Sequence, residues 1–324
     1  MIEVECEWMD EELRGAARTR ALAAAATLKA KRVALPCDET AAAKAAIGAA
    51  REAKLAVVAL VEPPRAGCPN EAKGRAAAID HAESVARALA PDALELVRYG
   101  FPDHGSQGND GALPGAGRFL AALCRCEGCT RRLATRQLDA AKVAAKVDKA
   151  LADVRTGKAT GPLERPEEIG PWLVKQLGGA ESAALLSVRR ESLVALVQEV
   201  RKRVAKTIEL QALAHPSPFV GGRAIGGGLL ALADWLAGFT LDLASDPEAL
   251  QPERLAAAVK SARTAALPTS RFTLRLPLPD ARERPALIAA LQAAAKEGLA
   301  AVRVVDAASW PEADLVALRT ALAK

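Results

Sequence analysis

The segment 271–305 reads RFTLRLPLPDARERPALIAALQAAAKEGLAAVRVV, and it contains the unit from which the rest of the chain is built. It begins with Arg271–Leu276 and ends with Ala301–Val305, two short runs of apolar and β-branched residues that are typical of buried strands. Between them, residues 282–297 are rich in alanine and leucine at helical spacing. A strand, a helix and a second strand of these lengths predict a βαβ unit with parallel strands.

The same pattern recurs along the chain. Eight runs are predicted as strands: Ile2–Cys6, Arg32–Cys37, Leu55–Val61, Leu94–Tyr99, Thr207–Leu213, Phe239–Leu243, Arg271–Leu276 and Ala301–Val305. A predicted helical region follows each of them, so the sequence favours an α/β fold, a closed (β/α)8 TIM barrel. An open doubly wound sheet would need a glycine-rich turn after its first strand, and Cys6–Asp10 contains no glycine.

One connection is much longer than the others. We predict a single barrel over residues 1–324 that carries a long helical insertion after strand four, at about 100–205. The insertion contains a cluster of cysteines and several helices. A lid, a small subdomain and a dimer surface are all compatible with it, so homo-oligomerisation through the insertion is one expectation.

Composition limits the kinds of binding partner and the cellular compartment that we expect for this protein. The chain has 324 residues, of which 26% are charged, and a net charge of +5. Acids and bases alternate along the helices, so no basic face for nucleic acid is expected. No stretch approaches the ~18 apolar residues of a membrane span. The acidic start Met1–Asp10 lacks the features of a signal peptide, and the cysteine pattern suits metal binding better than disulfides, so we expect a cytoplasmic protein.

Three cysteines, Cys124, Cys126 and Cys129, follow one another at C-x-C-x-x-C spacing within the insertion. Thiolates at this spacing can converge on one ion, and tetrahedral zinc requires a fourth ligand. Cys68, in the turn after the third strand, is the first candidate because that turn and the cluster lie at the same rim; His104 is the second. We predict a structural zinc site, with three reduced cysteines that hold no metal as the alternative.

These motifs resemble those of uncharacterised glycosidase-like (β/α)8-barrel proteins and, more distantly, of zinc-carrying bacterial β-galactosidases. The resemblance rests on Arg98–Gly105, Cys124–Cys129 and Pro216–Arg223, and it implies a carbohydrate-active barrel with a structural zinc ion. The chain departs from the β-galactosidase pattern, which has a glutamate acid after strand four and a glutamate nucleophile at the end of strand seven. Here those places hold Asp103–His104 and Arg275–Asp280.

Active sites of barrels lie at the carboxyl ends of their strands. Glycoside hydrolysis needs two carboxyl groups across a pocket, and we predict Asp103 and Asp242 for these roles. Asp242 faces either inward or outward according to the strand register. Side chains expected to contact a substrate at the same rim are Trp8, Arg98, Tyr99, His104, His215, Arg223 and Trp310, of which the two indoles would stack on a sugar ring.

Three functions therefore stand as hypotheses. The first is a glycoside hydrolase-like barrel acting on a saccharide or another small molecule. The second is a catalytically inactive barrel that binds a saccharide or a protein, which the missing glutamates favour. The third is a barrel enzyme for an anionic substrate, suggested by Arg98, Arg223 and Arg275 at one mouth.

Overall fold

The computed structural model describes residues 2–37, 41–64, 68–101, 113–159, 166–215, 225–226, 229–242, 252–264, 269–276 and 284–323. Its strands are β1 (Glu3–Glu7), β2 (Arg32–Pro36), β3 (Ala56–Val61), β4 (Ala93–Leu96), β5 (Glu209–His215), β6 (Ile225–Gly226), β7 (Gly238–Asp242), β8 (Arg271–Leu276) and β9 (Ala301–Val305). β4 is shorter than the predicted strand 94–99, and Arg98 just beyond it has a φ of 59°, in the left-handed region that interrupts extended backbone.

Eight of these strands close into a parallel barrel, which confirms the predicted fold. Their order is β1, β2, β3, β4, β5, β7, β8 and β9, and β9 pairs with β1 to complete the ring. The pairing of β4 with β5 aligns Ala93 with Glu209, although the insertion separates these strands in sequence. The short β6, which the sequence pattern does not predict, pairs with the end of β5.

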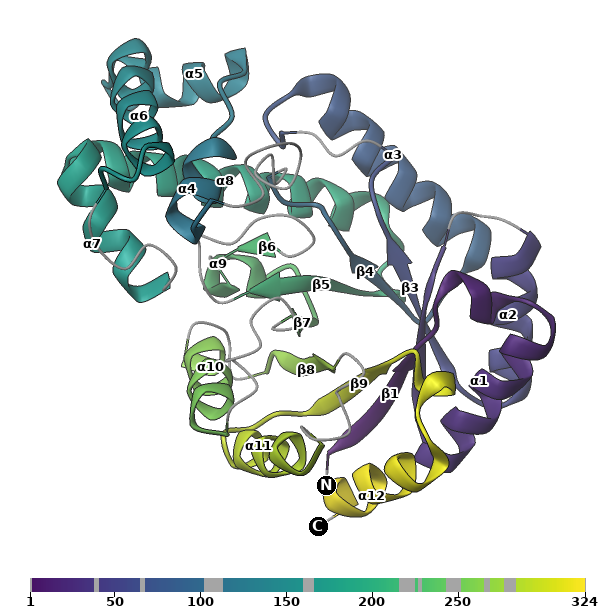
Figure 1. The fold of residues 1–324 in the computed structure, drawn as a ribbon. Helices are drawn as coiled ribbons and strands as arrows, with labels where there is room; N and C mark the ends of the chain where they lie inside the picture. Colours follow the sequence, from purple (N-terminus) through teal and green to yellow (C-terminus); the bar gives the residue numbers. More distant parts are fainter. Residues whose placement is uncertain are drawn as a thin grey trace.

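Helices surround the barrel (Figure 1). Those of the ring are α1 (Gly15–Leu28), α2 (Ala41–Glu52), α3 (Ala72–Leu89), α9 (Leu229–Ala233), α10 (Pro252–Thr264), α11 (Arg284–Lys296) and α12 (Glu312–Ala323), and two 3-10 turns, η1 (Asp10–Leu13) and η5 (Ala307–Ser309), follow β1 and β9. Val4 and Cys6 of β1 and Val302 and Val304 of β9 belong to the apolar core shared with these helices, because alternate strand residues point outward. None of the helices described is long and apolar enough to cross a membrane.

The insertion between β4 and β5 forms a helical lobe at one side of the barrel (Figure 1). It comprises α4 (Gly115–Ala121), α5 (Glu127–Ala134), α6 (Ala140–Arg155), α7 (Pro166–Leu177) and α8 (Gly179–Arg203). The lobe has an apolar core of its own, which includes Phe119, Val147 and Leu173. Helix α8 joins the two parts, since Val188 packs in the lobe core whereas Val197 packs in the barrel core.

Candidate functional site

Charged side chains from strands on opposite sides of the barrel meet in its interior. Arg303 of β9 is fully buried, donates from Nη1 to Oε1 of Glu95 at 2.7 Å, and donates from Nε to Oε2 of Glu5 at 3.1 Å. Thr240 donates to the same Glu95 at 2.6 Å. Burial alone lowers the pKa of Arg303, but Glu95 and Glu5 together raise it above its ordinary value. Apolar strand residues, among them Val58 of β3 and Leu213 of β5, form a separate cluster.

A second group of charges lies one layer higher, at the carboxyl ends of the strands. Arg275 of β8 donates from Nε and Nη2 to the two carboxylate oxygens of Glu7, at 2.7 and 2.8 Å. Its Nη1 lies 3.7 Å from Oδ1 of Asp242, at the end of β7. Asp242 therefore faces inward, and its side chain is 14% exposed against 3% for Glu7. We call Glu7, Arg275 and Asp242 the mouth cluster.

Glu7 was not among the predicted site residues, yet the sequence holds a signal for it. In Glu3–Glu7 the acids alternate with Val4 and Cys6. Alternation with a period of two places all three acids on one face of the strand. Each acid pairs with an arginine, and Arg271 contacts both the half-exposed Glu3 and the buried Glu5.

The three aromatic residues among the predicted substrate-binding residues have side chains that are buried inside the protein. Tyr99 is 2% exposed and its hydroxyl donates to the carbonyl of Ala78 at 2.9 Å. Trp310 is 6% exposed and its indole donates to the carbonyl of Val305 at 3.3 Å. Trp8 is 1% exposed. The structure therefore buries all three aromatic side chains, and their contact with a substrate stays a prediction.

The structure describes some of the other predicted residues and not the rest. Arg98 is half exposed and forms an ion pair of 3.3 Å with Glu62, which follows β3. His215 ends β5, where its backbone pairs with Gly226, and its side chain lies outside the described part of the structure. Three further residues, Asp103, His104 and Arg223, lie outside the described residues.

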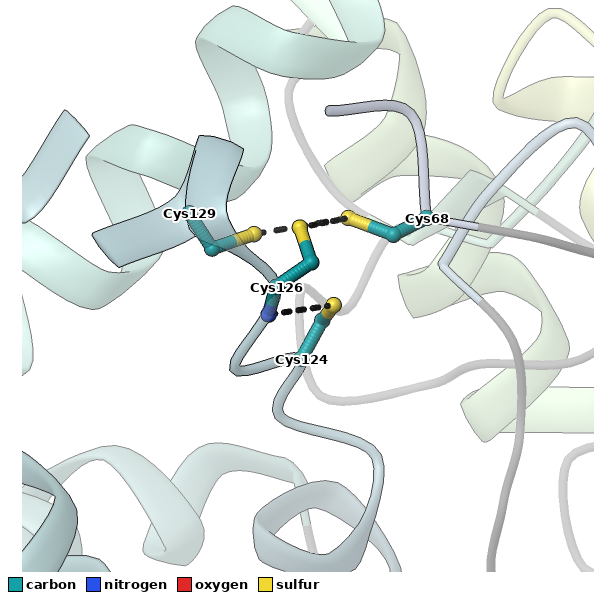
Figure 2. Close-up of side chains that lie close together, drawn as sticks. All are labelled: Cys68, Cys124, Cys126 and Cys129. Carbon is teal, nitrogen blue, oxygen red and sulfur yellow. Dashed lines mark hydrogen bonds between the residues drawn. The ribbon is translucent and has the colours of Figure 1, made fainter. Parts of the chain in front are cut away.

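The four predicted metal-binding cysteines come together. Their sulfur atoms all lie within 4.8 Å of one another, with Cys68 Sγ 3.4 Å from Cys129 Sγ and 3.8 Å from Cys126 Sγ. Figure 2 shows Cys124 and Cys126 on the segment that leads into α5 and Cys129 on that helix, facing Cys68 from the loop after β3. The cluster thus joins the lobe to the barrel, as the placement of Cys68 at the same rim predicts.

The surroundings of the sulfur atoms suit a thiolate-bound metal. Asn70 donates from its backbone N–H to Cys68 Sγ at 3.4 Å and from its side chain to Cys129 Sγ at 3.2 Å. The backbone N–H of Cys126 points to Cys124 Sγ at 3.3 Å. Hydrogen bonds from Cys129 and Cys68 lower the pKa of Cys124, and the same bonds with Cys124 raise the pKa of Cys68 and Cys129, so without a metal the cluster favours one thiolate held by its neighbouring thiols. Hydrogen bonds to charged sulfur and orientation of ligands by neighbouring groups are usual in metal sites.

Tetrahedral zinc has Zn–S bonds of about 2.3 Å, which separates the sulfur atoms by about 3.8 Å. The distances of 3.4 and 3.8 Å and the limit of 4.8 Å are compatible with that spacing. The donor set therefore fits a closed four-thiolate site. Such a site leaves no position for water, and it cross-links the chain.

Comparison with known proteins shows a likeness in fold alone. No protein-family model matches the chain, and no curated protein matches its sequence. Among solved structures, the spore cortex-lytic enzyme SleL of Bacillus cereus superposes with a TM-score of 0.52 at 8% sequence identity, over 99% of this chain and 74% of SleL. This defines the class of the molecule as a (β/α)8 barrel similar to that lytic enzyme.

Proposed function

We propose that the protein is a carbohydrate-active barrel of the glycoside-hydrolase type, whose site lies at the carboxyl ends of the strands. The mouth cluster carries the proposal, because it places the carboxylates of Glu7 and Asp242 where barrel enzymes hold their reactive groups. The fold shared with a cortex-lytic enzyme supports it. Asp242 lies beside the cation Arg275, which suits the ionised carboxylate of a glycosidase pair, and Asp103 is proposed as the acid.

Turnover of a panel of aryl glycosides and glycan polymers tests this function. We expect the wild-type chain to release sugar from at least one substrate, and Asp242→Asn and Asp103→Asn each to reduce kcat by a factor of at least about 100. Asp80→Asn, which changes an exposed carboxylate on α3, is the matched control and should leave turnover unchanged. Absence of turnover across the panel would reject the hydrolase assignment.

A barrel that binds a saccharide without cleaving it is the second candidate. Both oxygens of Glu7 accept hydrogen bonds from Arg275, which leaves Asp242 as the more exposed carboxylate of the mouth cluster. Saccharides that raise the melting temperature without being cleaved would support this reading. The anionic-substrate alternative is weakened because Glu7 and Asp242 already offset the charge of Arg275.

We propose zinc as the ion held by Cys68, Cys124, Cys126 and Cys129, with the structural role of fixing the lobe to the barrel. The four-thiol donor set at tetrahedral spacing supports it. Elemental analysis of protein purified without chelator should give about one zinc per chain. Cys68→Ser should lower that content, whereas Cys37→Ser, which changes a buried cysteine outside the cluster, should not. Metal-free wild-type protein would contradict the proposal.

A further inference from the structure

Cys68 and Cys129 hold two parts of the molecule in sulfur contact. Cys68 follows β3 of the barrel, Cys129 lies in the first turn of α5 in the lobe, and their sulfur atoms are 3.4 Å apart. Asn70 positions both, since its backbone N–H donates to Cys68 Sγ and its side chain donates to Cys129 Sγ. A disulfide has an S–S length of about 2.0 Å, so the two sulfur atoms need to approach each other by about 1.4 Å to form one.

The cysteine cluster is partly accessible to a small oxidant. Cys124 and Cys126 are half-buried, whereas Cys68 and Cys129 are 4% and 5% exposed. A peroxide therefore meets the outer pair of thiols first. Because all four sulfur atoms lie within 4.8 Å of one another, a sulfenic acid formed on the outer pair has an inner thiol beside it. A sulfenic acid in that position condenses with the thiol to a disulfide.

We propose that Cys68 and Cys129 form a reversible disulfide when the cluster reacts with a peroxide, so that a covalent bond joins lobe and barrel. The inference concerns the cysteines of the proposed zinc site, but it needs only their thiols. The bond connects residues 61 positions apart, and closing a loop of that length restricts the unfolded chain. The junction is then tied in the oxidised state as well as in a zinc-bound state, whereas the reduced, metal-free cluster has neither link.

The oxidation consumes one peroxide for each disulfide. One peroxide oxygen is transferred to a cysteine sulfur, which loses two electrons and becomes a sulfenic acid, and the other oxygen leaves as water. A neighbouring thiol then attacks that sulfur, the S–S bond forms, the S–O bond breaks, and the oxygen leaves with the thiol proton as a second water. Thiol–disulfide exchange within the cluster moves the bond to Cys68 and Cys129. Where four thiolates hold zinc, two protons from solvent complete the two waters, and the two remaining thiolates are too few for a closed tetrahedral site.

Treatment of the full-length chain with hydrogen peroxide, before and after removal of metal by a chelator, tests the proposal. All six cysteines are free in the reduced protein, and we expect two of them to lose reactivity toward a thiol reagent until dithiothreitol is added. Any bound zinc should be released in step with that loss. Disulfide formation in protein purified without zinc would support this inference and reject the zinc assignment. Zinc-containing protein that keeps all six thiols would do the reverse.

Peptide mapping without reduction identifies the bonded pair. Trypsin leaves Cys126 and Cys129 on one peptide, and a glutamate-specific protease separates them by cleavage after Glu127. We expect the fragment with Cys129 to be linked to the fragment with Cys68. A link from Cys68 to another cysteine would overturn the pairing, and disulfides confined to the lobe would overturn the proposal as a whole.

Two serine variants provide the matched comparison. Cys68→Ser should abolish the link between barrel and lobe, whereas Cys37→Ser, which changes a buried cysteine outside the cluster, should leave it unchanged. Equal yields of linked peptide from the two variants would contradict the assignment. Should Cys68→Ser fail to fold, the map of the wild-type chain decides between a bridge from Cys68 and one within the lobe.

Discussion

Gly128 shows how one missing side chain shapes the junction of lobe and barrel. It lies between Cys126 and Cys129, in the first turn of α5. A Cβ atom at this position would overlap the carbonyl oxygen of Asn70 and lie 2.9 Å from Asn70 Cβ. The same Asn70 donates hydrogen bonds to two of the cysteines, so close approach at Gly128 and the geometry of the sulfur atoms are linked.

Gly128→Ala should therefore destabilise the protein by about 1 to 3 kcal/mol, the usual cost of forcing an extra methyl group into a packed site. Urea unfolding measures the loss, and zinc content should fall with it. Gly48→Ala is the control, since Gly48 lies within α2 and a Cβ there meets no atom within 4 Å. That change should be neutral or stabilise by up to about 1 kcal/mol. Equal effects of the two substitutions would contradict the packing account.

Glu12 provides a prediction about pH. Its carboxyl is 3% exposed and accepts a hydrogen bond from the backbone of Met9 at 2.7 Å. Burial raises the pKa of Glu12 from its ordinary value of 4.5 to about 7, and nearby Asp306 adds to the rise. The folded state then holds a proton that the unfolded state has lost. The contribution of Glu12 to the free energy of unfolding is largest below about pH 4.5. It falls as the pH rises toward 7 and stays constant above that value.

Glu12→Gln should remove this dependence, because glutamine does not titrate and still offers an oxygen to Met9. Relative to wild type, the variant should gain about 2 to 3 kcal/mol of unfolding free energy between pH 5 and pH 8. Urea titrations of both proteins at the two pH values measure the difference, in which the contributions of other groups cancel. A difference that does not change with pH would show that Glu12 titrates normally.

Features of the molecule that depend on local sequence signals, such as the eight barrel strands, can be predicted from the sequence. Apolar and β-branched runs separated by helical stretches predict eight strands because each signal is local. The C-x-C-x-x-C spacing is equally local, and the position of Cys68 follows from the topology of the barrel. The charged side chains inside the barrel are not predicted, because barrel interiors are usually filled with apolar side chains. The inward register of Asp242 was left open, since a shift of one residue reverses the face of a strand.

Arg303 of β9 is a buried cation that pairs with two buried carboxylates. Arg303→Met removes the cation but leaves Glu5 and Glu95, both at most 1% exposed, without their shared partner. Loss of one member of a buried ionic group costs about 3 to 5 kcal/mol, and we expect a loss in that range in urea unfolding. Arg87→Met, in an exposed pair with Glu83 on α3, should cost about 0.5 kcal/mol or less. Similar losses for the two variants would contradict the buried-network account.

In the part of the chain that the structure describes, the barrel and the lobe each have an apolar core, and helix α8 and the thiol cluster link the two. Helix α8 contributes Val188 to the lobe core and Val197 to the barrel core. The cysteine cluster provides a second connection, because Cys68 follows β3 and the other three cysteines precede or begin α5. Regions held by few contacts open locally at lower free energy than the rest of a fold. Loss of the proposed zinc should thus loosen the lobe before the barrel.

Native-state hydrogen exchange of the full chain, with and without a zinc chelator, measures this difference. Chelation should raise exchange in α5 and at the start of α6 by a factor of at least about 10, equivalent to about 1.4 kcal/mol of local opening free energy. Amides of β1, β8 and β9 should keep their protection, because the ladder that pairs Glu5 with Arg303 and Thr273 with Ala301 does not involve the cysteines. Cys68→Ser should reproduce the effect without chelator, since it removes the cluster cysteine that comes from the barrel side. Uniform acceleration across both cores would mean that the cluster stabilises the molecule as one unit, and unchanged exchange would mean that the cluster does not hold the lobe to the barrel.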